Sequence, residues 1–389
     1  MLGTCAVLSV SILFIYWIRH CKNTEGTKLI YRRTEANESI VNLCPSFQEF
    51  YKVPFLLRNG VIHTFVSAFR CPPPDIGFKL LREYIESSDD NTRLALDWYI
   101  SGQKIERCRP TILMLHGLNG SASALYIQWM MWQAHMKGYQ CCALNNRGCG
   151  DTSLADPKGY NAAFTGDIAD TVNYIREVAI DKETPLFMIG FSLGGGLLMK
   201  YLSEQGSLLT AKVQAAIAIC ASFNMHVSFR HIENPFSVKN RIINRILARG
   251  LVEYVKRHEE IISSAAHIDV KRVYKSVTIS QFDESYVLPA HGFKDVAHYY
   301  DECSTDSRLH LIRVPLLCIH SADDPICPAA GIPLDAFDKH ENQILALIPT
   351  GGHVGFLQNA IHRSHSLMEK MCMQYFGAIR ARSQTQTAG

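Results

Sequence analysis

Gly190-Phe191-Ser192-Leu193-Gly194 is a G-x-S-x-G stretch that follows the apolar run 185–189 and precedes the helix-like run 197–202. A strand that turns sharply into a helix exposes the hydroxyl of its middle residue, and glycines at both ends let the turn close without side-chain clashes. The stretch therefore predicts an α/β fold in which Ser192 is a nucleophile. It also predicts that a base and an acid follow later in the chain.

Short apolar or alternating runs on both sides of this stretch predict eight strands, and helical runs separate most of the later ones. Such alternation is typical of a mostly parallel sheet that is covered by helices on both faces. The first two runs flank a Ser-Ser-Asp-Asp-Asn turn and predict a hairpin. The strands are predicted at 79–85, 93–100, 111–115, 140–145, 186–189, 213–221, 315–319 and 344–348, and the helices between them at 124–137, 164–178 and 192–205.

A serine hydroxyl needs a histidine to take its proton, and His353 is the best candidate among the 16 histidines. It stands in Gly351-Gly352-His353-Val354-Gly355, a glycine loop directly after the last predicted strand. The acid that orients this histidine is expected after the preceding strand, where Asp323 and Asp324 are adjacent. We favour Asp324, beside Pro325, and leave Asp323 as the alternative. The order serine, acid, histidine is that of α/β-hydrolases.

The stretch His116-Gly117-Leu118-Asn119-Gly120 follows the strand predicted at 111–115. In an α/β-hydrolase, a loop at this place supplies one backbone N–H of the oxyanion hole, and the residue after the nucleophile supplies the other. This predicts the backbone N–H groups of Leu118 and Leu193 as the oxyanion hole. A glycine loop alone could equally bind a phosphate, so the assignment depends on Ser192.

The composition of the 389 residues excludes several classes of protein. The chain is 47% hydrophobic, which is enough for one large core. Its net charge is only +3, so the charge gives no indication of nucleic-acid binding. The basic stretch 239–257 is interpreted as a solvated helix face. The 13 cysteines are scattered and include no Cys-x-x-Cys pair, so we expect neither a disulfide framework nor a metal site. No metal or organic cofactor is required.

The chain is predicted to be divided into an anchor, a linker, a catalytic domain and a tail. Residues 1–22 are apolar, lack a basic start and a small-residue cleavage site, and end in a basic cluster, which favours a retained single-pass membrane anchor in an endomembrane such as the endoplasmic reticulum. The positive-inside rule places the rest of the chain in the cytoplasm, although two charges do not fix the orientation. Residues 23–75 are expected to be a linker and approach segment, 76–380 the catalytic domain with a helical cap at about 222–311, and 381–389 a polar tail.

Several segments resemble the membrane-anchored α/β-hydrolase-domain proteins of the AB hydrolase 4 family, whose bacterial branch is called YheT-type. The resemblance runs from about residue 45 to 375 and includes the N-terminal anchor. It implies an eight-stranded sheet, a triad of Ser192, Asp324 and His353, and hydrolysis of carboxylic esters in phospholipids, acylglycerols or short-chain esters. The segments that carry it are 109–118, 145–148, 190–195, 281–284, 314–325 and 351–356.

These features predict a membrane-anchored serine hydrolase that cleaves lipid esters through an acyl-enzyme. Its partners are then a lipid ester substrate and the membrane, and no nucleic acid. The preference for lipids depends on the anchor, the apolar cap and the resemblance, since no substrate motif is present. Two alternatives are a soluble-substrate, short-chain carboxylesterase and a catalytically silent member that binds lipid or serves as a scaffold.

Overall fold

The computed structural model describes residues 26–74, 79–100, 102, 104–358 and 366–388. The membrane anchor predicted at residues 1–22 lies outside the described residues. Within the described ranges, no helix combines the length and the apolar character needed to cross a membrane.

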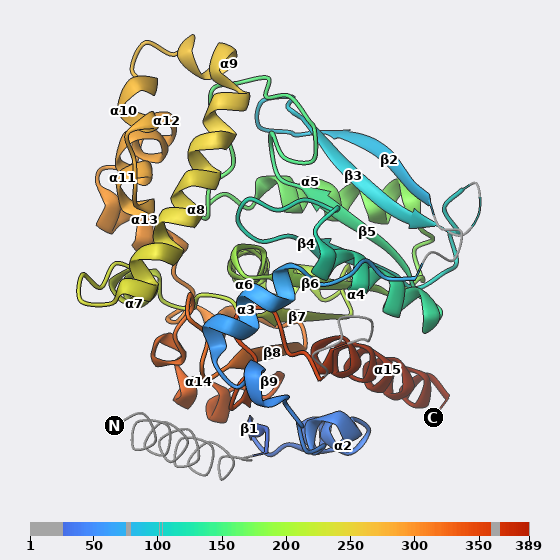
Figure 1. Ribbon diagram of the computed structural model, residues 1–389. Coiled ribbons are helices and arrows are strands. Elements are labelled where there is room, and N and C mark those ends of the chain that lie inside the picture. The colour runs from blue at the N-terminus through green and yellow to red at the C-terminus, as the bar shows by residue number, and fades with distance from the viewer. Residues whose placement is uncertain (1–25, 75–78, 101, 103, 359–365, 389) are drawn as a thin grey trace, which may run out of the picture.

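A single nine-stranded sheet, in the order β1-β9-β8-β7-β6-β4-β5-β3-β2, forms the centre of the described structure (Figure 1). Strands β4 to β9 are parallel, and the β2–β3 hairpin pairs antiparallel with β5 at one edge. All eight predicted strands are present: six are parallel strands whose burial on both faces leaves near-continuous apolar runs in the sequence, and the other two form the predicted hairpin. They are β2 (Lys79–Glu86), β3 (Arg93–Ile100), β4 (Thr111–Leu115), β5 (Gln140–Asn145), β6 (Leu186–Phe191), β7 (Ala215–Ile219), β8 (Leu316–Ser321) and β9 (Gln343–Ile348).

The ninth strand comes from the segment that we expected to be a linker. Strand β1 (Lys28–Ile30) pairs antiparallel with β9, and the helices α2 (Glu35–Asn42) and α3 (Gly60–Ala68) follow it. The expectation of a linker at 23–75 is therefore wrong for its described part, which belongs to the body of the fold. The reason is packing: several apolar side chains of this segment are buried in the main core, namely Ile40, Val41, Cys44, Phe47, Tyr51, Val53 and Leu57.

Helices cover both faces of the sheet, as the alternation predicted. One face packs against α4 (Leu125–Met136), α15 (Leu367–Ala388) and α2, and the other against α5 (Gly166–Tyr174), α6 (Leu193–Gln205) and α14 (Leu334–Lys339). A π-helical turn, η3 (Ile175–Ala179), continues α5. Short 3-10 turns are η1 (Pro45–Phe47), η2 (Phe55–Leu57), η4 (Gly206–Leu209), η6 (Leu309–Leu311) and η7 (Ala329–Gly331).

Between β7 and β8 the chain leaves the sheet and forms a helical layer at one end of the molecule (Figure 1). This layer occupies the region where the cap was expected, and its apolar side chains form a core cluster of their own. Side chains cap its longer helices: Ser237 accepts a hydrogen bond at the start of α8, and Asn224 does so at the start of α7. The layer contains α7 (Met225–Ile232), α8 (Val238–Arg257), α9 (Glu259–Ser263), α10 (Val270–Tyr274), α11 (Ile279–Phe282), the π-helical turn η5 (Asp283–Val287), α12 (Leu288–His291) and α13 (Val296–Cys303).

The polar tail expected at 381–389 is helical in its described part, because α15 continues to Ala388. No glycine or proline follows Gly377 before that point to end the helix. Ser383 fastens this end to the body of the fold, since the side-chain amide of Gln214 donates a hydrogen bond of 2.9 Å to its hydroxyl. The prediction of a tail was based on the polar composition of these residues, and it is wrong for the part that forms the end of α15.

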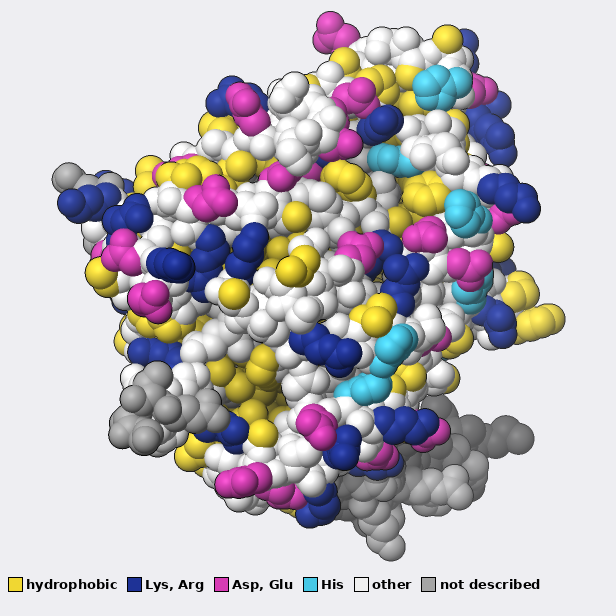
Figure 2. All heavy atoms as spheres, turned by 180° about the vertical axis from the view of Figure 1, so that it is seen from behind, with side chains coloured by type: hydrophobic (Ala, Val, Ile, Leu, Met, Phe, Trp, Pro, Cys, Tyr) yellow, Lys and Arg dark blue, Asp and Glu magenta, His cyan; other side chains and the backbone are white. Residues whose placement is uncertain are grey.

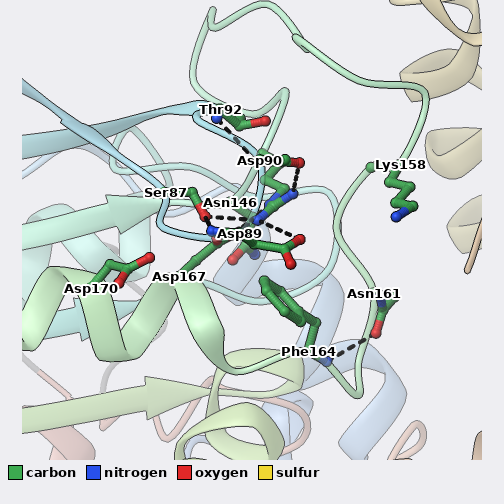
Figure 3. Close-up of polar contacts among 12 residues, drawn as sticks. Ser87, Asp89, Asp90, Thr92, Asn146, Lys158, Asn161, Phe164, Asp167 and Asp170 are labelled. Atoms are coloured by element: carbon green, nitrogen blue, oxygen red, sulfur yellow. Dashed lines mark hydrogen bonds and ion pairs between the residues drawn. The ribbon is translucent and has the colours of Figure 1, made fainter.

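A buried ion-pair network fastens the β2–β3 turn to the sheet. The Arg147 guanidinium, 3% exposed, donates two hydrogen bonds of 2.7 Å to Asp167 on α5. It also donates to the Ser87 hydroxyl at 2.9 Å and to Asp90 at 2.5 Å, both in the turn that Figure 3 shows converging with Asp167. The network links three segments that are far apart in the sequence.

We expect Arg147→Met to lower the free energy of unfolding by about 3–5 kcal/mol, because the carboxylate of Asp167 would stay buried without its cation. Arg272→Met is the matched control. Arg272 is 62% exposed and lies 3.6 Å from Glu284, so its loss should cost under about 1 kcal/mol. Denaturant unfolding of the two variants measures the difference. Equal losses would show that the network adds nothing beyond a surface pair.

Candidate active site

The G-x-S-x-G stretch forms a strained turn between β6 and α6. Ser192 has φ of 53° and ψ of −117°, a conformation that costs a non-glycine residue on the order of 1–3 kcal/mol. Its backbone N–H donates to the carbonyl of Ile219 at 2.8 Å, which ties the turn to β7. The flanking glycines are sterically required: a Cβ on Gly190 would lie 2.3 Å from the carbonyl oxygen of Gly194, and one on Gly194 would lie 2.3 Å from that of Leu115.

His353 meets this serine from the loop after β9. Its Nε2 lies 2.7 Å from Ser192 Oγ, which is hydrogen-bond distance. The loop is fastened on both sides of the imidazole: the backbone N–H of His353 donates to Thr64 Oγ1 at 2.8 Å, and that of Val354 donates to Cys220 Sγ at 3.4 Å. The histidine predicted from the Gly-Gly-His pattern is therefore in reach of the predicted serine.

Asp324 lies on the other side of the imidazole. Its Oδ2 is 2.8 Å and its Oδ1 is 3.1 Å from His353 Nδ1. The backbone N–H groups of Ile326 and Cys327 donate to Oδ1 at 2.8 and 2.9 Å, which fixes the carboxylate. Burial alone would raise the pKa of Asp324, but its interactions with His353 and other neighbours outweigh burial and hold the pKa below its ordinary value. The buried group is therefore ionised at neutral pH.

Asp323, the alternative, has a different set of contacts. Its Oδ1 accepts hydrogen bonds from the backbone N–H groups of Gly351 and Gly352, each at 2.9 Å. It also accepts at 2.5 Å from the Ser321 hydroxyl, while Oδ2 accepts at 2.5 Å from the Thr350 hydroxyl. Asp323 thus holds the loop that carries His353, and Asp324 contacts the imidazole itself.

The loop after β4 packs directly against the serine. A Cβ added to Gly117 would lie 3.2 Å from Ser192 Cβ, a tight contact, so a glycine suits this close approach. The Gly117 N–H donates to the Tyr126 hydroxyl at 2.9 Å, which turns the loop toward the site. Leu118 and Leu193 both border the cavity next to the serine, and Leu193 is the first residue of α6, where N–H groups have no partner within the helix.

Buried His116 stabilises the same loop in one tautomer. Its Nε2 accepts a hydrogen bond of 3.1 Å from the backbone N–H of Asn146, so its Nδ1 carries the proton and donates to the carbonyl of Gly117 at 2.8 Å. Burial lowers the pKa of His116 to about 4, which keeps the ring neutral. His116 is therefore suited to positioning the loop and not to exchanging protons at neutral pH.

Ser192 and His353 border a cavity of about 290 Å³ that extends into the helical layer. Its lining is mostly apolar, and α3, the loop after β4 and the cap helices all contribute to it. One carboxyl interrupts the apolar wall: Asp283, which is buried, accepts a hydrogen bond of 3.0 Å from the Tyr300 hydroxyl. Burial raises the pKa of Asp283 well above its ordinary value. The cap contributes apolar side chains that include Phe229, Ile232, Leu247, Leu251, Ile279, Phe282 and Val287.

Sequence reasoning missed the contribution of Thr64, Tyr126 and Cys220 to the site. Thr64 lies on α3, in the segment taken for a linker, and no local pattern marks a threonine that contacts a histidine 289 positions later. Among the described residues, Cys220, Asp324 and His353 are also spaced as metal ligands. Burial, followed by the charge of Asp324, raises the pKa of the Cys220 thiol, which disfavours the thiolate that a metal needs.

Comparison with known proteins assigns the chain to a family. The family model described as "Serine aminopeptidase, S33" matches residues 106–356, well over half of the chain. The chain belongs to this α/β-hydrolase family. Its fold is therefore the α/β-hydrolase fold that the sequence predicted, with one edge strand more than expected.

The relatives of this α/β-hydrolase include a phospholipase and a monoacylglycerol lipase. It is 28% identical over 340 residues to the human phospholipase ABHD3, covering 86% of this chain and 80% of that protein. It is 29% identical over 290 residues to a monoacylglycerol lipase of Saccharomyces cerevisiae, covering 74% of this chain and 61% of that protein. Among solved structures, an esterase of Pyrococcus furiosus matches 80% of this chain and 98% of its own, with 17% identity and a TM-score of 0.49. The chain is an enzyme of the carboxylic ester hydrolase class.

Proposed function

We propose that this α/β-hydrolase cleaves the carboxylic esters of lipids with Ser192, His353 and Asp324 as its catalytic triad. The observation that carries the proposal is the unbroken hydrogen-bonded series from Ser192 Oγ through His353 to Asp324, at the wall of an apolar cavity. In such a series the histidine activates the hydroxyl, and the aspartate keeps the histidine in the required tautomer.

In the first half of the reaction, Ser192 Oγ attacks the ester carbonyl carbon while His353 Nε2 takes the hydroxyl proton. The carbonyl oxygen becomes an oxyanion, and we assign the backbone N–H groups of Leu118 and Leu193 to bind it. The imidazolium that forms is stabilised by the ionised Asp324. When the tetrahedral intermediate collapses, the bond to the alcohol oxygen breaks and His353 returns the proton to that oxygen. The product is an acyl-enzyme on Ser192 and a free alcohol.

In the second half, a water molecule gives one proton to His353 Nε2 and attacks the acyl carbon. The same two N–H groups bind the second oxyanion. The bond to Ser192 Oγ then breaks, His353 returns its proton to the serine, and the carboxylic acid leaves. Each half-reaction restores the proton that it borrows, so the cycle requires only the ester and water.

The lipid preference is supported by the cavity and by the names of the relatives. An apolar wall built from the cap excludes water and favours an acyl chain over a charged group. The test is to measure carboxylic acid release from a phospholipid, a monoacylglycerol and a short-chain ester by the purified full chain. Preferential release from either lipid supports the proposal. Activity confined to the short-chain ester would favour the carboxylesterase alternative, and no turnover of any ester would favour a silent lipid-binding protein.

We further propose that the chain belongs to the AB hydrolase 4 branch of the family and that residues 1–22 anchor it in an endomembrane. The apolar composition of this segment supports the anchor. Deleting residues 1–22 should move most of the protein from the membrane fraction to the supernatant, while its rate on a soluble short-chain ester stays unchanged. If the full chain and the shortened chain are divided in the same way between membrane and supernatant after high-salt washing, residues 1–22 are not a membrane anchor.

A further inference from the structure

Helix α8 carries an exposed apolar stripe beside an exposed basic stripe. Val238, Ile242 and Ile246 are spaced by four residues and are 60%, 52% and 52% exposed. Arg241, Arg245 and Arg249 each lie three residues further along, so the two stripes are neighbours on one side of the helix. Phe236, two residues before α8, is 95% exposed and adds a further apolar side chain at this end of the helix.

The charge of this surface is of one sign. Between Val238 and Gly250, helix α8 has four cations and no acidic residue. Within the described chain, Arg241 and Arg245 form no ion pair, so their charges are available to a partner. Figure 2 shows the molecule from behind the view of Figure 1, and on that face Lys and Arg side chains are interspersed with Asp and Glu. The basic stretch 239–257, which we interpreted from the sequence as a solvated helix face, therefore also carries exposed apolar side chains.

A second helix that borders the cavity, α3, also exposes apolar side chains. Thr64, Ser67 and Ala68 of α3 line the cavity. The other side of this helix exposes apolar side chains, and the helix contains no acidic residue. These exposed side chains are Ile62 and Phe65, followed directly after the helix by Phe69, which is 79% exposed.

These two surfaces adjoin the walls of the cavity. Leu247 and Leu251, from the inner side of α8, line the cavity that contains Ser192, and the inner side of α3 lines it near His353. A partner bound to the outer sides of α8 and α3 would therefore lie next to the elements that enclose the substrate. The partner must accept apolar side chains and supply negative charge, which are the properties of an anionic bilayer surface.

We propose that the outer sides of α8 and α3 form a docking surface for an anionic lipid bilayer. The arginines of α8 contact lipid headgroups while the isoleucines and phenylalanines enter the boundary of the acyl region. Docking presents the cavity to lipids in the membrane plane. The role of docking in lipid hydrolysis rests on the proposed function. The binding to the bilayer does not, because it does not require Ser192.

The test places a reporter on the docking surface in a protein that does not hydrolyse lipid. Full-chain Ser192→Ala carrying Phe236→Trp is reconstituted with vesicles whose lipids are brominated on the acyl chain. The emission of the same protein without Phe236→Trp is subtracted. A second reporter, Phe69→Trp, tests α3 in the same way. We expect both new tryptophans to be quenched in vesicles that are about one third phosphatidylserine, and much less in phosphatidylcholine alone.

Arg241→Glu combined with Arg245→Glu should lower the ratio of docked to undocked protein by at least about 30-fold, since the loss of each basic group near an anionic surface contributes about a fivefold change and the two added carboxylates are repelled by the same surface. Lys271→Glu on α10 combined with Lys275→Glu directly after it is the matched control, with the same charge change at exposed positions that do not line the cavity, and should leave quenching unchanged. No quenching at either reporter, or equal effects of the two double variants, would overturn the docking surface. In the protein with Ser192 intact, both double variants should keep their rate on a soluble short-chain ester. If no protein with Ser192 intact hydrolyses any ester, the result contradicts the proposed function and not the docking surface.

Discussion

Alanine in place of Ser192 should lower kcat for ester hydrolysis about 10⁵-fold while leaving the fold intact. The nucleophile cannot be replaced by its neighbours, because the turn aims only this side chain at His353 Nε2. Removal of one oxygen atom leaves the strained backbone and its bond to Ile219 in place. The variant should therefore still bind substrate. Carboxylic acid release under single-turnover and steady-state conditions measures the loss.

A second serine in the same cavity provides the control. Ser222 also lines the cavity, but its hydroxyl is hydrogen-bonded to that of Ser228 at 2.7 Å. Ser222→Ala should lose at most about 10²-fold in rate, the scale of a small misplacement near a site. A fluorophosphonate probe should label the wild type and Ser222→Ala but not Ser192→Ala. Labelling of Ser192→Ala, together with a retained rate, would show that another residue is the nucleophile.

The strands of the main sheet and the proximity of Ser192 to His353 could be predicted from the sequence because each has a local pattern. Six parallel strands are buried on both faces and appear as apolar runs. Ser192 is marked by glycines that the turn needs for steric reasons, and His353 by the glycine loop that brings its backbone to Thr64. In each case the pattern surrounds the residue itself and directly follows a predicted strand, although the contact partners are 161 and 289 positions away in the sequence.

The remaining features could not be predicted because they depend on contacts between distant segments. His63 on α3 accepts a hydrogen bond from the backbone N–H of Leu357 at 2.8 Å, and its Nδ1 donates to the carbonyl of Leu57 at 2.9 Å. These contacts place the supposed linker beside the site. Burial lowers the pKa of His63 to about 4, so the ring stays neutral in this role. The segment 23–75 mixes polar and apolar residues without a regular period, so its sequence does not indicate that it packs beside the site.

The adjacent aspartates also could not be told apart from the sequence. Asp323 and Asp324 differ by one position, and neither composition nor spacing ranks them. The turn after β8 sends one carboxylate to the imidazole and the other to the backbone of the loop that carries it. Two residues of the same type therefore acquire different roles from the direction of their side chains alone.

Asp324→Asn should lower kcat about 10⁴-fold, because an amide facing His353 Nδ1 favours the wrong tautomer and does not stabilise the imidazolium. Asp323→Asn makes the same chemical change one residue away. Its side chain would still accept from Gly351 and Gly352, but the amide nitrogen cannot accept from the Thr350 hydroxyl. We expect a loss of stability of about 1–3 kcal/mol and a much smaller loss of kcat. Rate and unfolding measured on both variants separate the two roles, and equal losses of kcat would contradict the assignment of Asp324.

The pH dependence of stability tests the charge of Asp324 further. The pKa of Asp324 is lower in the folded protein than its ordinary value, so the folded state favours the ionised carboxylate. Its contribution to stability is therefore fully present above the unfolded pKa, about 4, and is lost as the pH falls through the folded pKa. The stability difference between wild type and Asp324→Asn should accordingly be largest near neutral pH and should shrink below about pH 4. A difference that stayed constant through this range would mean that Asp324 acts in the folded protein as a neutral hydrogen-bonding group, and the imidazolium would then lack its counter-charge.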